Sequence, residues 1–226
     1  MPAGSSPPDV EVLREDNHLL ALNKPPGLLT QPSGTARDSL EARAKAYVRG
    51  SKGKTGNVFL HAVHRLDRVA SGIVLFARTS KALARVSEEV RARRVRKVYL
   101  AIVERKPARR EGTLRHFIRH RSHRAETARP GEEGARESAL SYRVLGEIVG
   151  TGFLLEIELH TGRYHQIRAQ LSEAGMPIVG DRRYGSRAPF PGGAIALHHA
   201  AMELRHPVTG ETMRIEAPHP LGWPGG

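Results

Sequence analysis

Short apolar runs separated by polar turns dominate the chain. Nine of them have strand length, at residues 10–13, 19–22, 58–63, 73–76, 98–103, 141–149, 153–160, 194–204 and 212–216. Three stretches with apolar positions at helical spacing predict helices over residues 38–48, with Asp38 as the cap, 80–93 and 163–174. Many neighbouring strands are joined by turns too short for a parallel crossover. The pattern therefore predicts an α+β fold: a mixed, largely antiparallel sheet with flanking helices and loops.

The segments between these elements differ in composition. Residues 1–8 are rich in Pro, Ser and Gly, which predicts a disordered tail, and residues 9–226 have the balance of one folded domain. Residues 105–124 are basic and interrupted by Pro107 and Gly112, and residues 126–137 are rich in Gly and Glu. We expect exposed or mobile loops over both.

The charge of the chain indicates what kind of partner it binds. The chain carries 36 Lys and Arg against 23 Asp and Glu, a formal net charge of +13, which favours polyanions and above all nucleic acid. Such an excess can also serve solubility alone. However, 13 of the cations fall within residues 91–124, where Glu104 and Glu111 are the acidic residues. This concentration favours a binding face.

Several classes of protein are disfavoured. The absence of cysteine excludes disulfides, thiolate metal sites and cysteine nucleophiles, and it fits the cytoplasm. No run approaches the ~20 apolar residues of a membrane span. There is no GxxxxGK[ST] or GxGxxG loop for a nucleotide cofactor, and the close histidine pairs do not match HExxH. We expect no cofactor, no metal, no membrane partner and a monomer.

Two arginines and one carboxylate lie between the apolar runs 58–63 and 73–76, in His64-Arg65-Leu66-Asp67-Arg68. Burying such a cluster costs desolvation, which is tolerable where the charges meet partners or line a cleft. The alternative is an ordinary Arg/Asp turn held by surface ion pairs.

Two further segments carry candidate chemistry. Residues 161–168 enter a helix directly from a strand, so the helix N-terminus could hold an anion, with His165 and Arg168 on one face; a solvated helix face is the alternative. In the strand at 98–103, alternation places Tyr99 on the same side as Lys97, although a core tyrosine would show the same pattern.

In this order, the segments resemble the RluA-type family of RNA pseudouridine synthases over residues 10–218. Residues 64–72 meet its signature His-Arg-Leu-Asp-Arg-x-x-Ser-Gly, while 23–27, 97–101 and 162–168 resemble its first motif, its tyrosine strand and its final active-site helix. Val69-Ala70 is a departure, because members commonly carry Asp-Thr there. Many relatives also carry an N-terminal S4 RNA-binding domain, for which residues 1–8 leave no room, so we expect the catalytic domain itself to grip the RNA.

The resemblance implies the family's catalytic fold and the isomerisation of uridine to pseudouridine in structured ribosomal or transfer RNA, without a cofactor. It implies that Asp67 is the catalytic aspartate, Tyr99 stacks on the target base, Arg168 is the basic partner of Asp67, and Arg65 fills the space of the flipped uridine. Further residues of the matched motifs are expected to bind RNA: His64, Arg68, Arg163, His165 and Gln166. Residues 91–124 and the loop 52–54 are expected to grip the RNA.

Two rival functions remain open at this point. A catalytically silent RNA-binding module shares the charge but has no reason to keep Asp67, Tyr99 and Arg168 together. A nuclease would need clustered carboxylates for two metals or a general acid and base, and the sequence shows no such cluster around Asp67.

Overall fold

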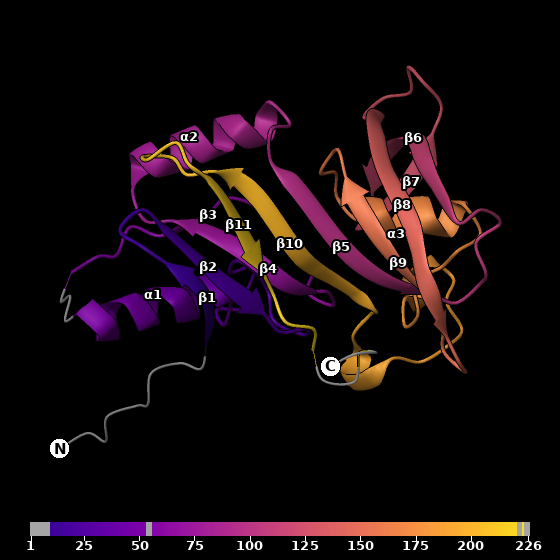
Figure 1. Cartoon of the computed structure of the whole chain (residues 1–226), viewed down its shortest axis with the longest axis horizontal. Helices are drawn as coiled ribbons and strands as arrows, with labels where there is room; N and C mark the ends of the chain where they lie inside the picture. The colour runs from indigo at the N-terminus through magenta and orange to yellow at the C-terminus, as the bar shows by residue number, and fades with distance from the viewer. Residues whose placement is uncertain (1–9, 53–55, 221–222, 224–226) are drawn as a thin grey trace. The chain divides into compact units, whose positions relative to one another are not determined.

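The computed structural model describes residues 10–52, 56–220 and 223 of the chain (Figure 1). The predicted tail at 1–8 and residues 53–54 of the predicted RNA-gripping loop lie outside this part. The chain divides into two compact units: unit 1 comprises Met1–Val95 with Glu203–Pro218, and unit 2 comprises Arg96–Met202 with His219–Gly226. That they act as one catalytic domain over 9–226 stays a prediction.

Unit 1 is built on two buried strands. Its elements are β1 (Glu11–Glu15), β2 (Leu19–Lys24), α1 (Leu40–Lys52), β3 (His61–Ala62), β4 (Ser71–Ala77), α2 (Ser80–Arg91) and β11 (Thr212–Glu216). The pairs β1–β2, β2–β4 and β3–β4 are antiparallel. β2 and β4 are apolar on both faces and almost wholly buried, with Leu20 opposite Phe76. They form the core on which the loops around them are held.

The first helix shows how local side chains set its start. Ser39 Oγ accepts the N–H of Ala42 at 3.2 Å, so Ser39 caps α1 and the helix begins at Leu40. The prediction that Asp38 is the cap is wrong, because its carboxylate instead pairs with Arg43 at 2.7 Å.

Unit 2 is built on an antiparallel sheet. Its elements are β5 (Arg96–Val103), β6 (Glu111–Arg121), β7 (Arg124–Ala128), β8 (Arg136–Ile148), β9 (Gly152–Leu159), α3 (Gln166–Glu173) and the 3₁₀ helices η1 (Arg182–Tyr184) and η2 (Pro191–Gly193). The strand order is β5-β9-β8-β6-β7, and every one of these pairs is antiparallel. β10 (Leu197–Arg205) starts beside β5 and runs on into unit 1. The predicted α+β class with a largely antiparallel sheet is confirmed.

The prediction of an exposed or mobile loop over 105–124 is wrong for residues 111–121 and 124, which are strand, and the one over 126–137 is wrong at its two ends, whereas residues 129–135 do connect two strands. β6 and β7 form a hairpin, and β8 begins at Arg136 (Figure 1). In β6, Leu114 and Ile118 point toward the protein while Thr113 and Arg115 are exposed. This is the period of two of a half-buried strand, which the many arginines hid in the sequence. α3 packs on the hairpin through a small core of Ile118, Ala125, Ala169 and Tyr184.

Candidate active site

The Asp67 loop, residues 63–70, leaves the sheet between β3 and β4. The Nε2 atom of His64 accepts the N–H of Leu75 in β4 at 3.2 Å, so a side chain replaces the strand partner. The strand predicted over 58–63 is confined to the two residues of β3. The His64 ring therefore binds backbone within its own unit, and the RNA contact expected of it stays a prediction.

Thr30 fixes the loop directly before Asp67. Its Oγ1 accepts the N–H of Leu66 and donates to the carbonyl of Leu66, each at 3.1 Å. Thr30 and Leu66 are both buried, whereas Asp67 is half-buried and Arg65 is exposed. Both backbone polar groups of Leu66 are thus satisfied by one hydroxyl, which sets the direction in which Asp67 leaves the loop.

The loop after Asp67 is tied to the segment that resembles the family's first motif. The N–H of Gly27 donates to the carbonyl of Arg68 at 2.7 Å, and Nε of Arg68 donates back to the carbonyl of Gly27 at 2.8 Å. The N–H of Ala70 donates to the carbonyl of Asp67 at 3.1 Å. The hydrogen bond from Ala70 to Asp67 joins backbone atoms, so it needs no polar side chain at Val69 or Ala70.

A buried lysine, which the sequence analysis missed, lies beneath the same loop. Lys24 is 0% exposed, and its Nζ donates to the carbonyls of Pro25 at 2.9 Å, Leu28 at 2.9 Å and Arg68 at 3.3 Å. Three acceptors match the three donors of an ammonium group. Burial lowers the pKa of Lys24 from 10.5 to about 7, against the charge of Asp67, which raises it. The sequence signal that could have identified this residue is a lysine at the end of an apolar strand, directly before two prolines.

In unit 2, Arg168 forms a buried ion pair. Its Nε lies 2.7 Å from Oδ2 of Asp181 and its Nη2 lies 2.9 Å from Oδ1, and the two residues are 5% and 1% exposed. The guanidinium also lies 4.9 Å from the centre of the Tyr184 ring. The sequence analysis missed Asp181, which follows Arg168 by thirteen positions in a loop. The expected pairing of Arg168 with Asp67, a residue of the other unit, stays a prediction.

The last predicted helix starts at Gln166 rather than at Arg163, because His165 is left-handed with φ 48°. The side-chain oxygen of Gln166 accepts from Thr161 Oγ1 at 2.7 Å and from the N–H of Arg163 at 3.0 Å. The ring of His165 is stacked on Tyr164 at 3.8 Å. His165 and Gln166 are buried, so the alternative of a solvated helix face is wrong for them.

Tyr99 lies in β5 and is 6% exposed. Its ring is stacked on His199 of β10, with the ring centres 4.4 Å apart and the planes 10° apart. Burial lowers the pKa of Lys97 in the same strand. One face of the Tyr99 ring is therefore covered by His199, and the stacking of Tyr99 on a base stays a prediction.

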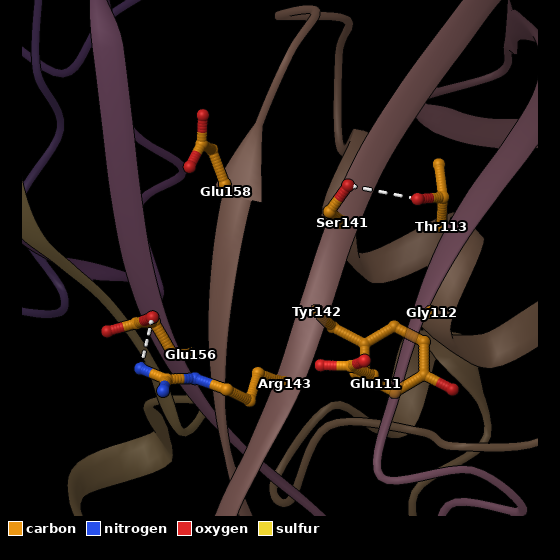
Figure 2. A pocket seen from close by; sticks show the side chains of 8 residues that line it. All are labelled: Glu111, Gly112, Thr113, Ser141, Tyr142, Arg143, Glu156 and Glu158. Atoms are coloured by element: carbon orange, nitrogen blue, oxygen red, sulfur yellow. Dashed lines mark hydrogen bonds and ion pairs between the residues drawn. The ribbon is translucent and has the colours of Figure 1, made fainter.

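The described residues also contain a cavity of about 350 Å³ on β6, β8 and β9 (Figure 2). It is lined by Glu111, Gly112, Thr113, Ser141, Tyr142, Arg143, Glu156 and Glu158. Arg143 pairs with Glu156 at 3.0 Å, and Thr113 bonds Ser141 at 3.1 Å. None of the predicted site residues lines this cavity, and its three glutamates disfavour a polyanion.

Within residues 10–52, 56–220 and 223, no three His, Asp or Glu side chains gather closely enough to hold a metal ion. No helix in the same ranges has the length and apolar character to cross a bilayer.

Comparison with known proteins decides the family. Residues 18–173, which include Asp67, Tyr99 and Arg168, match the RNA pseudouridylate synthase family. The chain belongs to this family of RNA-modifying isomerases. The RluA-type resemblance expected from the motifs is confirmed.

The relatives are bacterial. The chain is 35% identical to an uncharacterized RNA pseudouridine synthase of Bacillus subtilis (strain 168), over 94% of this chain and 69% of that protein. It is 33% identical to ribosomal large subunit pseudouridine synthase D of Xanthomonas campestris pv. campestris, over 96% and 68%. It is 34% identical to ribosomal large subunit pseudouridine synthase C of Escherichia coli O6:H1, over 92% and 66%. The chain thus spans about two thirds of the length of these pseudouridine synthases.

Two solved structures share the fold. Human RNA pseudouridylate synthase domain containing 4 gives a TM-score of 0.77 at 23% identity, covering 93% of this chain and 89% of that chain. Human RNA pseudouridylate synthase domain containing 1 gives a TM-score of 0.72 at 22% identity, covering 96% and 86%. These likenesses agree with the fold class predicted from the sequence.

Proposed function

We propose that this pseudouridine synthase isomerises specific uridines of structured ribosomal or transfer RNA, with Asp67 as its catalytic carboxylate. The observation that carries the proposal is the Asp67 loop: within the matched family signature, hydrogen bonds from Thr30, Lys24 and Arg68 fix the backbone on both sides of one half-buried aspartate. Such preorganisation is what a residue acting on a bound ribose requires.

The reaction breaks the C1′–N1 bond, turns the uracil and forms a C1′–C5 bond, so no atoms enter and no cofactor is consumed. Asp67 supplies the carboxylate at the ribose, either as the nucleophile toward C1′ or as the base that takes the 2′ hydrogen. Tyr99, held on one face by His199, stacks on the target base and is a candidate to accept the C5 proton. Arg168 supplies the basic partner of Asp67.

The remaining motif residues fall into two groups, those that are exposed and those that make hydrogen bonds within their own unit. Arg65, Arg68 and Arg163 are exposed, and we assign them to the RNA: Arg65 to the space of the flipped uridine, and the others to phosphates. His64, His165 and Gln166 were expected to contact RNA. They make hydrogen bonds within their own units, so we assign them to holding the RNA-contacting loops in place.

Structured RNA is the proposed partner because the chain carries a formal net charge of +13, which favours binding to the phosphate groups of a nucleic acid. Action as a monomer in the cytoplasm, including ribosomal or transfer RNA processing, belongs to the same proposal. The rival is a catalytically silent RNA-binding module, which would share the charge and the fold.

The decisive experiment is tritium release from RNA labelled at uridine C5, using transcribed ribosomal and transfer RNAs. We expect release by the wild type and none by Asp67→Ala, with both proteins binding the RNA. Asp38→Ala is the matched control, since Asp38 is an exposed carboxylate of the same unit whose side chain is 63% accessible. If the wild type releases no tritium from any RNA that it binds, the silent module is the better reading.

A further inference from the structure

The turn at the tip of the β6–β7 hairpin has an unusual backbone. Arg121 of β6 lies opposite Arg124 of β7, and the two residues between them, Ser122 and His123, are left-handed with φ 45° and 63°. A two-residue turn with both central residues in this region suits a right-twisted hairpin but favours Gly, Asn or Asp. Side chains other than these persist there when the surroundings hold the backbone in place.

The surroundings hold this turn from one side. The carbonyl of His123 accepts from Tyr164 Oη at 3.2 Å and from Arg183 Nη1 at 2.8 Å. Two residues further on, the N–H of Ala125 donates to Tyr184 Oη at 2.8 Å. Three side chains from the segments around α3 and η1 therefore fix the tip of the hairpin.

The tip presents unneutralised cations. Residues 121–124 are all exposed, as is Arg183. The Arg124 guanidinium lies 5.1 Å from the centre of the Tyr184 ring, which orients it without removing its charge. Across the described ranges, no carboxylate forms an ion pair with Arg121, Arg124 or Arg183.

Other arginines of the same sheet are balanced by glutamates. Four ion pairs do this: Arg96 with Glu158, Arg115 with Glu137, Arg119 with Glu132, and Arg143 with Glu156. The basic stretch 91–124 is therefore not one uniform surface. Its strands carry neutralised pairs, whereas the hairpin tip carries free, positioned guanidinium groups.

We propose that this hairpin tip, defined as residues 121–124 with Arg183, is a docking point for the phosphate backbone of the RNA substrate. Guanidinium groups form bidentate hydrogen bonds with phosphate, and a fixed scaffold lowers the entropy lost on binding. Phosphate contacts position an RNA without reading its sequence. This inference rests on the proposed function and adds that the tip sets KM rather than kcat.

The test compares two double variants that remove equal charge. Arg121→Ala/Arg124→Ala removes the tip cations, and Arg14→Ala/Arg37→Ala removes two exposed arginines of unit 1 that lie outside the basic stretch 91–124. We expect the tip variant to bind RNA about tenfold more weakly. The slope of log affinity against log salt concentration should be shallower by about one to two, because each lost phosphate contact reduces its magnitude by about 0.7–0.9. KM should rise with kcat unchanged, and the control should change little.

Equal losses of RNA affinity in both double variants would mean a diffuse charge effect and would overturn the docking point. Wild-type affinity of the tip variant, or a loss confined to kcat, would overturn it as well. Because Arg124 packs on Tyr184, Arg121→Ala alone is measured as well, and it should give about half of the slope change in a protein with unchanged circular dichroism. Asp67→Ala separates the two proposals, since it should bind with the wild-type slope and release no tritium. Wild-type protein that binds through the tip but releases no tritium would refute the proposed function and leave the docking point standing.

Discussion

The two units hold their predicted site residues by different means. In unit 1 the backbone around Asp67 is fixed by a buried lysine and a hydroxyl that bind neutral carbonyl and amide groups. In unit 2, Arg168 is fixed by a carboxylate that balances its charge. The Lys24 ammonium can lose its proton at moderate pH, whereas a guanidinium cannot. The difference predicts that the Asp67 loop is sensitive to pH and that the surroundings of Arg168 are sensitive to charge balance.

The largest effect should come from Arg168→Met. Removing the guanidinium leaves Asp181 as a buried charge without its partner, which we expect to lower the free energy of unfolding by about 3–5 kcal/mol. Urea denaturation measures the loss. The double variant Arg168→Met/Asp181→Leu should recover most of the stability, because an apolar pair can replace a buried ion pair.

Recovered stability without recovered tritium release in this double variant would support a role of Arg168 in the reaction. A single variant as stable as the wild type would contradict the charge-balance account of unit 2.

Lys24→Met should have the next largest effect. Three carbonyls would lose their donor, which we expect to cost about 2–3 kcal/mol in the free energy of unfolding near pH 7. A smaller loss than this, with unchanged tritium release, would show that the Asp67 loop does not depend on the lysine. Arg78→Met, which removes a half-buried cation of the same unit paired with Glu15, is the matched control for activity.

The pH dependence of the same variant sharpens the comparison. The pKa of Lys24 is lowered to about 7 in the folded protein from 10.5, so between these values the unfolded chain binds more protons than the folded one. The free energy of unfolding therefore rises with pH across that window and is lowest below pH 7. Denaturation of the wild type and Lys24→Met at pH 7, 8.5 and 10 should show a difference that grows with pH. A constant difference would refute the lowered pKa of Lys24.

Much of unit 1 could be predicted from the sequence, because its strands are continuous apolar runs and the Asp67 loop carries a dense motif. β2 and β4 lie where the runs at 19–22 and 73–76 predicted them. The burial of Lys24 could not be predicted in the same way. It depends on Leu28 and Arg68, which the fold brings around one ammonium from separate positions along the chain.

Unit 2 was harder to predict for two physical reasons. Its hairpin alternates by two residues, but arginines and histidines occupy positions on both faces, so hydropathy alone suggested loops. Asp181 contacts Arg168 through a loop that has no periodicity, and a side-chain pair of this kind is set by tertiary packing. His165 in the left-handed region shortened the predicted helix for a similar reason, since its ring is held by Tyr164 and Tyr184.

The smallest effect should come from Thr30→Val, which keeps the side-chain shape and removes the hydroxyl. The N–H and carbonyl of the buried residue Leu66 would lose their partner, which we expect to lower the free energy of unfolding by about 1–2 kcal/mol. We also expect kcat to fall roughly tenfold, because Asp67 would shift. Thr30→Ser retains the hydroxyl and should keep most of the wild-type kcat. Because KM reports binding of RNA, it should change little in either variant. A fall in stability without a fall in kcat would mean that the hydroxyl serves the fold of unit 1 and that Asp67 is positioned by Lys24 and Arg68 alone.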